Sequence, residues 1–268
     1  MTKDTLQPNL LEYHLGNDVI AFSTTRDGGK SVGLYSEFNI THYCNDDPEH
    51  VLQNRQLLCD KLGIHDNCLL LPRQTHSDHV RCIDNKFLEN PSEIRTQLIE
   101  DTDALITNIP GLCIGVSTAD CIPILLFDPV HRVIAAVHAG WRGTVFHIVN
   151  KAIEAMQATY GTIASDLKAV IGPGISQAAF EVGNEVYEQF EQANFPMSDI
   201  AALLPGPQGK KWHIDLWAAN FFLLEEAGLP LSSIQVCGIC TYTEHERFFS
   251  ARRLGINSGR IFNSIMLQ

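Results

Sequence analysis

Two apolar runs joined by a turn constrain the fold of this chain more than any other feature. Residues 122–127 (IPILLF) and 133–137 (VIAAV) are apolar and partly β-branched. Between them, residues 128–132 (DPVHR) carry the Asp and Pro that are typical of turns. The pattern predicts a β-hairpin.

The hairpin brings two reactive side chains close together. With the turn centred between Pro129 and Val130, residues whose numbers sum to 259 face each other, and Cys121 and His138 form such a pair. Directly opposed residues have Cβ atoms roughly 4.5–5.5 Å apart. This distance suits two ligands of one zinc ion, because Zn–S bonds are about 2.3 Å long and Zn–N bonds about 2.0–2.1 Å. The fold has to bring in His76 from far away in the sequence.

One cysteine and two histidines are the kind of ligand set that a zinc site with an open fourth position requires. Each one taken alone also has an ordinary interpretation. Cys121 could be a small core residue, His138 a strand-end histidine bonded to a carbonyl, and His76 a solvated loop residue. Taken together they predict a metalloenzyme with one zinc ion per chain. Copper is the less favoured metal, although thiolate and imidazole also bind copper(I).

Length and charge narrow the class of partner. The 268 residues can bury a large core, and we expect a single domain over residues 1–268 with its core at about 20–268. The net charge is −12 and no run of Lys or Arg offsets it. This argues against binding to nucleic acid or to an anionic membrane and favours a small-molecule substrate. No pattern in the sequence assigns an oligomeric state.

The sequence favours a reducing compartment. It shows no signal peptide and no apolar stretch of membrane-spanning length, so we expect a cytoplasmic protein. The eight cysteines are dispersed through a chain large enough to fold without disulfides, which predicts free thiols. Cys237 and Cys240 form a lone C-x-x-C, for which a redox role is disfavoured.

Helix signals mark three segments. A helix is expected from Asp47-Pro48 to Gly63, a second capped by Thr144 and ending at Gly161, and a third capped by Asp215 and ending at Gly228. The expected strands outside the hairpin cover residues 19–25, 68–71, 79–83, 104–107, 112–116, 167–171, 234–237 and 263–267. Residues 140–143 then lie at a strand-to-helix junction, where ligands often bind. Gly172-Pro-Gly174 is interpreted as a tight turn.

A set of short motifs resembles the laccase-domain purine nucleoside phosphorylase family, formerly catalogued as multicopper polyphenol oxidoreductases. The motifs are Thr24-Thr-Arg26, Gln74-x-His76, Asp103-Ala-Leu, Thr118-Ala-Asp-Cys-x-Pro123, His138-Ala-Gly-Trp-Arg-Gly143, Ile171-Gly-Pro173, Phe248-Phe-Ser-x-Arg-Arg253 and Gly259-Arg260. The resemblance implies an α/β (α+β) fold, a three-layer α/β/α unit with mixed β-sheets. It also implies one zinc ion held by His76, Cys121 and His138.

The implied activity is phosphorolysis of adenosine, inosine and guanosine to base and ribose-1-phosphate, often with adenosine deamination and methylthioadenosine cleavage. Phosphorolysis needs cations that hold phosphate, and guanidinium groups match phosphate oxygens. The candidates are Arg26, Arg142, Arg252 and Arg253, each with a structural salt bridge as the alternative. Asp120 could be a general base or could orient a metal ligand. Gln74 could orient a ligand or contact the substrate.

The sequence departs from the family pattern at several positions. Ala251 stands where tyrosine is expected and Leu254 where an acidic residue is usual, which affects the expected substrate contacts near the C-terminus. Ser77 replaces a common glycine, and residues 43–45 (YCN) replace a more usual His-Val-Gly. The three metal ligands are unchanged.

Three other functions stay open. One is a cytoplasmic amidase that edits a serine-containing peptidoglycan precursor, for which zinc or the Cys121 thiolate could activate attack on an amide. A copper-dependent polyphenol oxidase is disfavoured, because multicopper oxidation needs more histidine ligands than this set supplies. The last is a metal-stabilised scaffold, in which His42 or His79 would fill the fourth ligand position.

Overall fold

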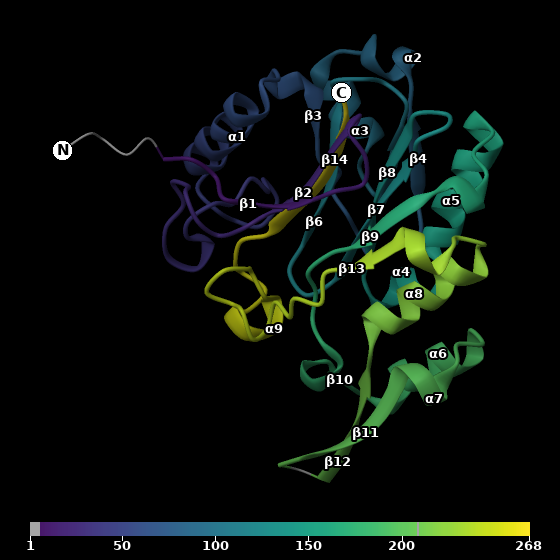
Figure 1. The fold of residues 1–268 in the computed structure, drawn as a ribbon. Coiled ribbons are helices and arrows are strands. Elements are labelled where there is room, and N and C mark those ends of the chain that lie inside the picture. The colour runs from purple at the N-terminus through teal and green to yellow at the C-terminus, as the bar shows by residue number, and fades with distance from the viewer. Residues whose placement is uncertain (1–5, 208) are drawn as a thin grey trace.

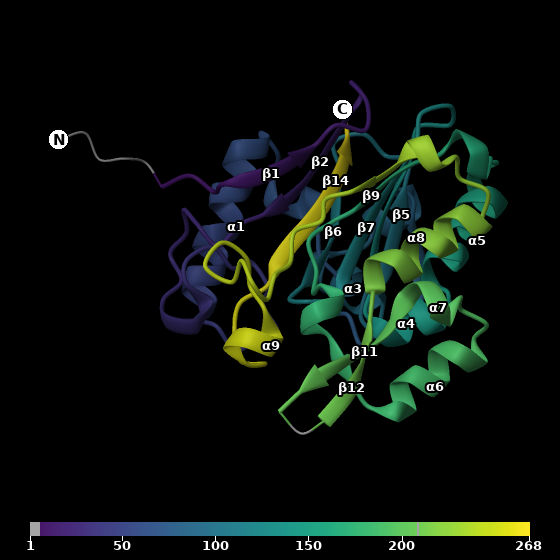
Figure 2. The same ribbon diagram turned by 60° about the horizontal axis from the view of Figure 1, so that its bottom comes forward.

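Two mixed β-sheets packed against each other form the centre of the structure, a computed structural model that describes residues 6–207 and 209–268 (Figures 1 and 2). The first has the order β1 (Leu10–Tyr13), β2 (Val19–Thr24), β14 (Ile261–Leu267), β6 (Cys113–Thr118) and β3 (Leu69–Leu70). The second has the order β13 (Ile234–Val236), β9 (Lys168–Ile171), β7 (Ile122–Asp128), β8 (Val133–Ala139), β5 (Ala104–Thr107) and β4 (Val80–Ile83).

The hairpin β7–β8 is buried on both faces, which explains its continuous apolar sequence. Along β8, Val133, Ala135 and Val137 face the helices, whereas Ile134 and Ala136 face the first sheet. Because side chains alternate along a strand, His138 lies on the face of Ile134 and Ala136. His138, which was predicted to bind a metal together with Cys121, therefore lies at the end of the space between the two sheets.

Helices cover the outer face of each sheet, on opposite sides of the molecule (Figures 1 and 2). α1 (Pro48–Leu62) packs Leu58 and Cys59 against the first sheet. α5 (Ile148–Tyr160) and α8 (Leu216–Glu226) pack against the second. The predicted α/β class, with helices on both sides of mixed sheets, is confirmed. The layer between the helices consists of two sheets instead of one.

Two of the three predicted helix starts are confirmed. Asp47 accepts a hydrogen bond from the Glu49 amide at 2.9 Å, and Asp215 accepts one from the Ala218 amide at 2.9 Å. The start at Thr144 is wrong. Thr144 lies inside the short helix α4 (Trp141–Val145), where its hydroxyl donates back to the Gly140 carbonyl at 3.0 Å. The chain then bends at His147, whose φ is 57°, before α5 begins.

The predicted hairpin register is wrong by two residues. Asp128 pairs with Val133 and Pro123 with His138, so four residues form the loop. The Asp128 carboxylate causes this, because it accepts hydrogen bonds from the Val130 and His131 amides and fixes a wider turn. A slip of two residues keeps every side chain on its face, so the juxtaposition of Cys121 and His138 survives.

A third, antiparallel sheet was not predicted. It consists of β10 (Glu181–Val182), β12 (Gly209–Ile214) and β11 (Ala201–Gly206), and β11 and β12 project from the body of the molecule (Figure 1). The remaining helices are α2 (Asn85–Leu88), α3 (Ser92–Leu98), α6 (Asn184–Gln192), α7 (Met197–Ile200) and α9 (Ala251–Leu254). Within the described ranges, no helix combines the length and apolar character needed to cross a bilayer. All eight cysteines are free thiols, as predicted.

Candidate functional site

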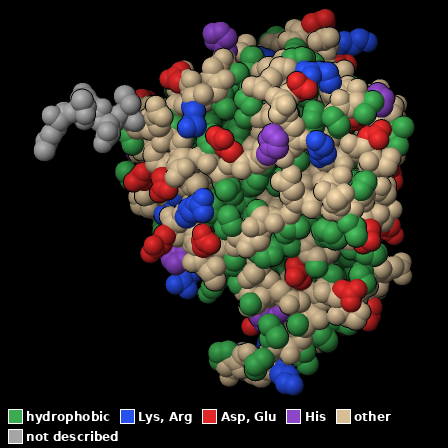
Figure 3. Space-filling model, viewed as in Figure 1, with side chains coloured by type: hydrophobic (Ala, Val, Ile, Leu, Met, Phe, Trp, Pro, Cys, Tyr) green, Lys and Arg blue, Asp and Glu red, His purple; other side chains and the backbone are tan. Residues whose placement is uncertain are grey.

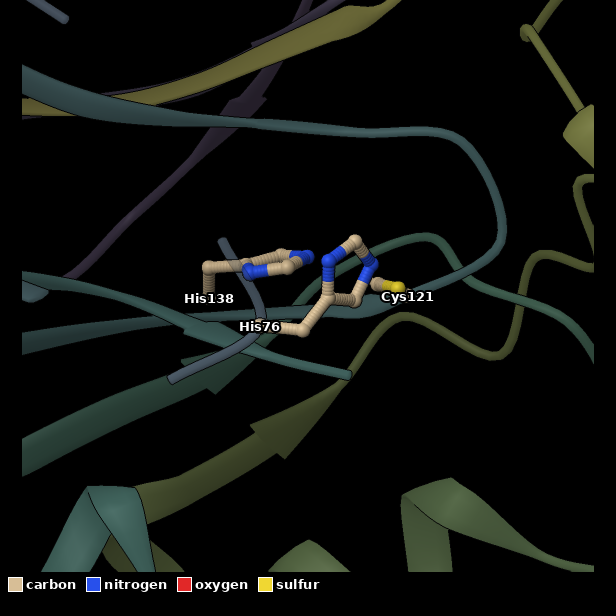
Figure 4. Close-up of side chains that lie close together, drawn as sticks. All are labelled: His76, Cys121 and His138. Carbon is tan, nitrogen blue, oxygen red and sulfur yellow. The ribbon is translucent and has the colours of Figure 1, made fainter. Parts of the chain in front are cut away.

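His76, Cys121 and His138 meet at one end of the two central sheets. Their ligand atoms all lie within 4.8 Å of one another, and the two imidazole rings are 5.0 Å apart at 76°. His138 comes from β8, Cys121 from the turn before β7, and His76 from the loop between β3 and β4 (Figure 4). His138 is buried, whereas His76 is exposed, so the cluster is open to solvent on one side.

Two of the three ligand segments have an uncommon backbone conformation. His76 has a φ of 61°, and Asp120, directly before Cys121, has a φ of 89°. Non-glycine residues at positive φ are uncommon and persist where the surroundings fix them. At His76 these surroundings are supplied by a single buried carboxylate.

Asp103 organises both histidine segments. One carboxylate oxygen accepts from His138 Nδ1 at 2.6 Å and from the His76 amide at 3.1 Å. The other accepts from the Thr75 amide at 3.2 Å and from the amide and hydroxyl of Ser77 at 2.9 and 2.6 Å. Because Nδ1 of His138 donates to Asp103, its Nε2 is the atom left for a metal.

The electrostatics of the cluster favour a thiolate. Burial alone raises the pKa of the Cys121 thiol, but the adjacent His138 and His76 outweigh it and lower this pKa to about 6. Burial lowers the pKa of His138, while Cys121 and Asp103 raise it, to about 10. A thiolate and two imidazoles, one oriented by a carboxylate, fit the ligand set of a zinc ion with an open position.

The pKa of Asp103 predicts acid sensitivity. Burial raises this pKa, but the hydrogen bonds from His138 and Ser77 lower it overall from 3.8 to about 2. The unfolded state then binds more protons between those values, so Asp103 stabilises the fold above pH 4 and loses its effect as the pH falls towards 2. The shift corresponds to about 2 kcal/mol.

We expect this contribution to be missing from an Asp103→Asn variant. Denaturant unfolding of metal-free protein at pH 5 and pH 3 measures it in both proteins. Between pH 5 and pH 3, the free energy of unfolding should decrease more for the wild type than for the variant. Equal decreases would contradict the assignment.

Two glycines allow close approach to the ligands. A Cβ at Gly140 would lie 3.0 Å from His76 Cδ2, 3.1 Å from Cys121 Sγ and 3.7 Å from His138 Cε1. A Cβ at Gly174 would lie 2.3 Å from Ile122 Cδ1 and 3.1 Å from the Asp120 carbonyl. Gly174 therefore permits packing against the Cys121 turn, which is a more specific role than the simple turn expected for residues 172–174.

The ligand cluster lies in the wall of a cavity of about 500 Å³. Its lining includes three residues with hydroxyl groups, Tyr43, Ser117 and Thr118, and apolar residues such as Ile175, Phe180 and Ile256. Burial raises the pKa of the Tyr43 hydroxyl to about 12, so this group is protonated at neutral pH. The cavity lining therefore combines hydrogen-bonding and apolar residues.

Gln74, Asp120 and Arg252 also line this cavity. Both functional atoms of the Gln74 amide bind the backbone of Ser117, with Oε1 accepting from its amide and Nε2 donating to its carbonyl, each at 2.7 Å. Asp120 accepts a hydrogen bond on each of its oxygens. Arg252 extends over the Phe180 ring, 5.5 Å from its centroid.

The other three candidate arginines lie outside the cavity lining. Arg26 binds the carbonyls of Ser36 and His245, and Arg142 stacks on Trp141 at 4.3 Å. Arg253 lies over the Tyr242 ring at 5.3 Å.

Asp103 and Arg260 were named in the family motifs, but neither was assigned a role from the sequence. Arg260 lines the cavity. The position of Asp103 directly before the apolar run 104–107 was the available signal, since β5 pairs with β8. Asp103 lies one step beyond the Ala104–Val137 pair and thus beside His138.

Within residues 6–207 and 209–268, only this one group of three metal-binding side chains comes together. His42 lines a different cavity, with Arg55 and Arg95, and His79 binds the Asp101 carbonyl at 2.9 Å. Neither belongs to the cluster. Basic side chains are scattered singly among acidic ones on the face drawn in Figure 3.

Comparison with known proteins gives consistent similarities. A model of the family described as multi-copper polyphenol oxidoreductase laccase matches residues 20–268. A purine nucleoside phosphorylase from Bacteroides thetaiotaomicron is 44% identical over 267 residues, 100% of this chain and 98% of that protein. A protein named adenosine deaminase RL5, from an unknown prokaryotic organism, is 44% identical over 247 residues, 92% of this chain and 93% of that protein. The crystal structure of hypothetical protein YfiH from Bacillus licheniformis matches with a TM-score of 0.89 and 28% identity over 97% of both chains.

Proposed function

The chain belongs to the multi-copper polyphenol oxidoreductase laccase family, and from this membership we propose that it is a zinc-dependent purine nucleoside phosphorylase. The observation that carries the proposal is the His76, Cys121 and His138 cluster in a cavity that also contains the Arg252 side chain. The substrates are adenosine, inosine or guanosine with phosphate, and the products are base and ribose-1-phosphate. The relatives named purine nucleoside phosphorylase and adenosine deaminase support this substrate class.

His76, Cys121 and His138 would hold the zinc ion. When bound, zinc supplies Lewis-acid chemistry, which polarises an oxygen and eases proton loss from water at neutral pH. Asp103 keeps the Nδ1 proton on His138, so that Nε2 is the nitrogen that would give up its proton and bind the metal. The lowered pKa of Cys121 keeps its sulfur in the thiolate form that binds metal.

The remaining cavity residues suit the two substrates. The apolar lining residues Ile175, Phe180 and Ile256 suit contact with a purine ring. The hydroxyls of Tyr43 and Ser117 are hydrogen-bonding partners for a ribose. Among the four arginines proposed from the sequence, Arg252 is the one positioned to bind phosphate.

Adenosine deamination and methylthioadenosine cleavage are further proposed activities of the same cavity. Deamination needs water rather than phosphate at the electrophilic carbon, so it would proceed without phosphate. An amidase acting on a peptidoglycan precursor is the second candidate. One observation favours it, because Cys121, His138 and Asp103 also form a nucleophile, base and orienting carboxylate. Multicopper oxidation is disfavoured, because residues 6–207 and 209–268 contain one ligand cluster of three side chains.

The test is to incubate zinc-loaded protein with adenosine, with and without phosphate, and to separate the products by chromatography. We expect adenine and ribose-1-phosphate only with phosphate, and inosine in either case. Cys121→Ser should abolish both. The matched control is Cys113→Ser, because Cys113 is buried away from the cluster and its sulfur already has a hydrogen-bond partner in Ser264 at 2.9 Å.

The outcomes separate the candidates. Full activity in Cys113→Ser and none in Cys121→Ser would support the proposal. Zinc-loaded wild-type protein that leaves adenosine, inosine and guanosine unchanged would refute it and would move the amidase to first place.

A further inference from the structure

We propose that Asp120 is a positioning residue, which fastens the helix that carries Arg252 to the turn that carries Cys121. Its effect is to fix the anion-binding end of the cavity relative to the ligand cluster. The anion is inorganic phosphate, and this identity rests on the proposed function. This role differs from both roles suggested by the sequence, a general base or a residue that orients a metal ligand.

The hydrogen bonds of Asp120 carry the proposal. One carboxylate oxygen accepts from the Thr241 hydroxyl at 2.7 Å, and the other accepts from the backbone amide of Arg252 at 2.6 Å. Its carbonyl accepts from the Ile175 amide at 2.9 Å. The side chain is 9% exposed. Asp120 therefore joins three segments, because its carboxylate binds residues 241 and 252 and its carbonyl binds residue 175.

Arg252 has the character of an anion-binding group. In the described part of the chain, its guanidinium contacts only neutral partners, the carbonyls of Ala179 at 3.4 Å and Glu181 at 3.3 Å and the ring of Phe180. These contacts orient the group without neutralising its charge. It therefore presents an uncompensated cation to the cavity.

The helix that carries Arg252 depends on such anchors. α9 has four residues, too few to be stable alone. Its first turn is held by Asp120 at the Arg252 amide and by the Ser250 hydroxyl at the Arg253 amide. Loss of the Asp120 anchor should release α9 locally while the zinc ligands stay in place, since none of them bonds to this carboxylate.

Two substitutions of Asp120 distinguish positioning from acid–base catalysis. Asp120→Gly removes both acceptors and is compatible with the φ of 89°. Asp120→Asn keeps one acceptor for the Arg252 amide, and its NH2 group can donate to the Thr241 oxygen. A positioning role therefore predicts rescue by asparagine, whereas a general base would be lost in both variants. Asp128→Ala is the matched control, because Asp128 is also buried and also accepts backbone hydrogen bonds, at the far end of β7.

The experiment uses full-length zinc-loaded protein and two readouts. Limited trypsin digestion, with cleavage after Arg252 and Arg253 followed by mass spectrometry, reports the release of α9 and requires no activity. The KM for inorganic phosphate, compared with the KM for adenosine and with zinc content, reports the functional effect. For Asp120→Gly we expect cleavage and the phosphate KM each to rise about tenfold, with a much smaller change in the adenosine KM. Asp120→Asn and Asp128→Ala should stay near wild type in both.

Several results would overturn the proposal. Unchanged cleavage in Asp120→Gly would show that the carboxylate does not anchor α9. Equal loss of activity in Asp120→Asn and Asp120→Gly would show a general base, and loss of zinc would show action through Cys121. If the wild type consumes no nucleoside, the proposed function fails, and the cleavage measurement still decides the anchor. If Asp120→Gly does not fold, near-wild-type cleavage and phosphate KM in Asp120→Asn remain required.

Discussion

An Asp103→Asn variant is expected to bind zinc about 10–100-fold more weakly than the wild type and to lose about 3–5 kcal/mol of stability. The carboxylate accepts from three backbone amides, a hydroxyl and His138 Nδ1. An asparagine amide has only one accepting oxygen. Whichever way it is turned, its NH2 group faces at least one backbone amide that then lacks its acceptor.

Competition with a chromogenic chelator measures zinc affinity, and denaturant unfolding of the metal-free protein measures stability. Asp128→Asn is the matched control, because Asp128 is equally buried and pairs with His131 Nδ1 at 2.9 Å away from the metal ligands. The control should lose stability but keep zinc. Wild-type zinc affinity in Asp103→Asn would show that this carboxylate does not orient the ligands.

A Gly140→Ala variant is expected to lose zinc affinity by about 10–100-fold while the metal-free fold survives. The backbone at Gly140, with φ −64° and ψ 169°, suits alanine. The added methyl group would lie 3.0 and 3.1 Å from atoms of His76 and Cys121, which cannot retreat without leaving a shared metal. Overpacking of this kind costs about 1–3 kcal/mol, which sets the expected loss.

Zinc titration and thermal unfolding with and without chelator check this expectation. Gly143→Ala serves as the control, because its Cβ would also make close contacts, at 3.3 Å to Ile148 Cγ2 and 3.4 Å to the Ser77 and His138 carbonyl oxygens, but would touch no ligand side chain. The control should bind zinc normally. A Gly140→Ala protein with normal zinc affinity would mean that the cluster has more space than the structure indicates.

The local patterns of the sequence were sufficient to predict much of the fold. Some signals depend only on residues close by in the sequence. They include the apolar runs of β7 and β8, the helix caps at Asp47 and Asp215 and the glycine after α1. The hairpin register failed by two, because a buried Asp128 widened the turn, and the period of two made that error harmless to the site. β11 and β12 were missed because their sequences, AALLPG and GKKWHI, do not alternate between apolar and polar residues. Most of these residues are exposed or half-buried.

In the site, only residues whose side-chain chemistry is distinctive could be predicted from the sequence. The three side chains proposed as metal ligands do converge. They could be proposed because thiol and imidazole groups are common metal ligands and are recognisable in a sequence. Asp103 acts on partners 26–35 residues away, so its role depends on how β5 and β8 pair. The sequence also could not show which arginine lies in the cavity, because the four guanidinium groups are chemically equivalent. The fold places only Arg252 of these four in the cavity lining.

The most direct measurement is phosphate-dependent release of adenine from adenosine before chelation, after complete metal removal, and after one equivalent of zinc per chain is restored. We expect activity to disappear with the metal and to return with zinc, in proportion to the zinc bound. Full activity in verified metal-free protein would contradict this expectation.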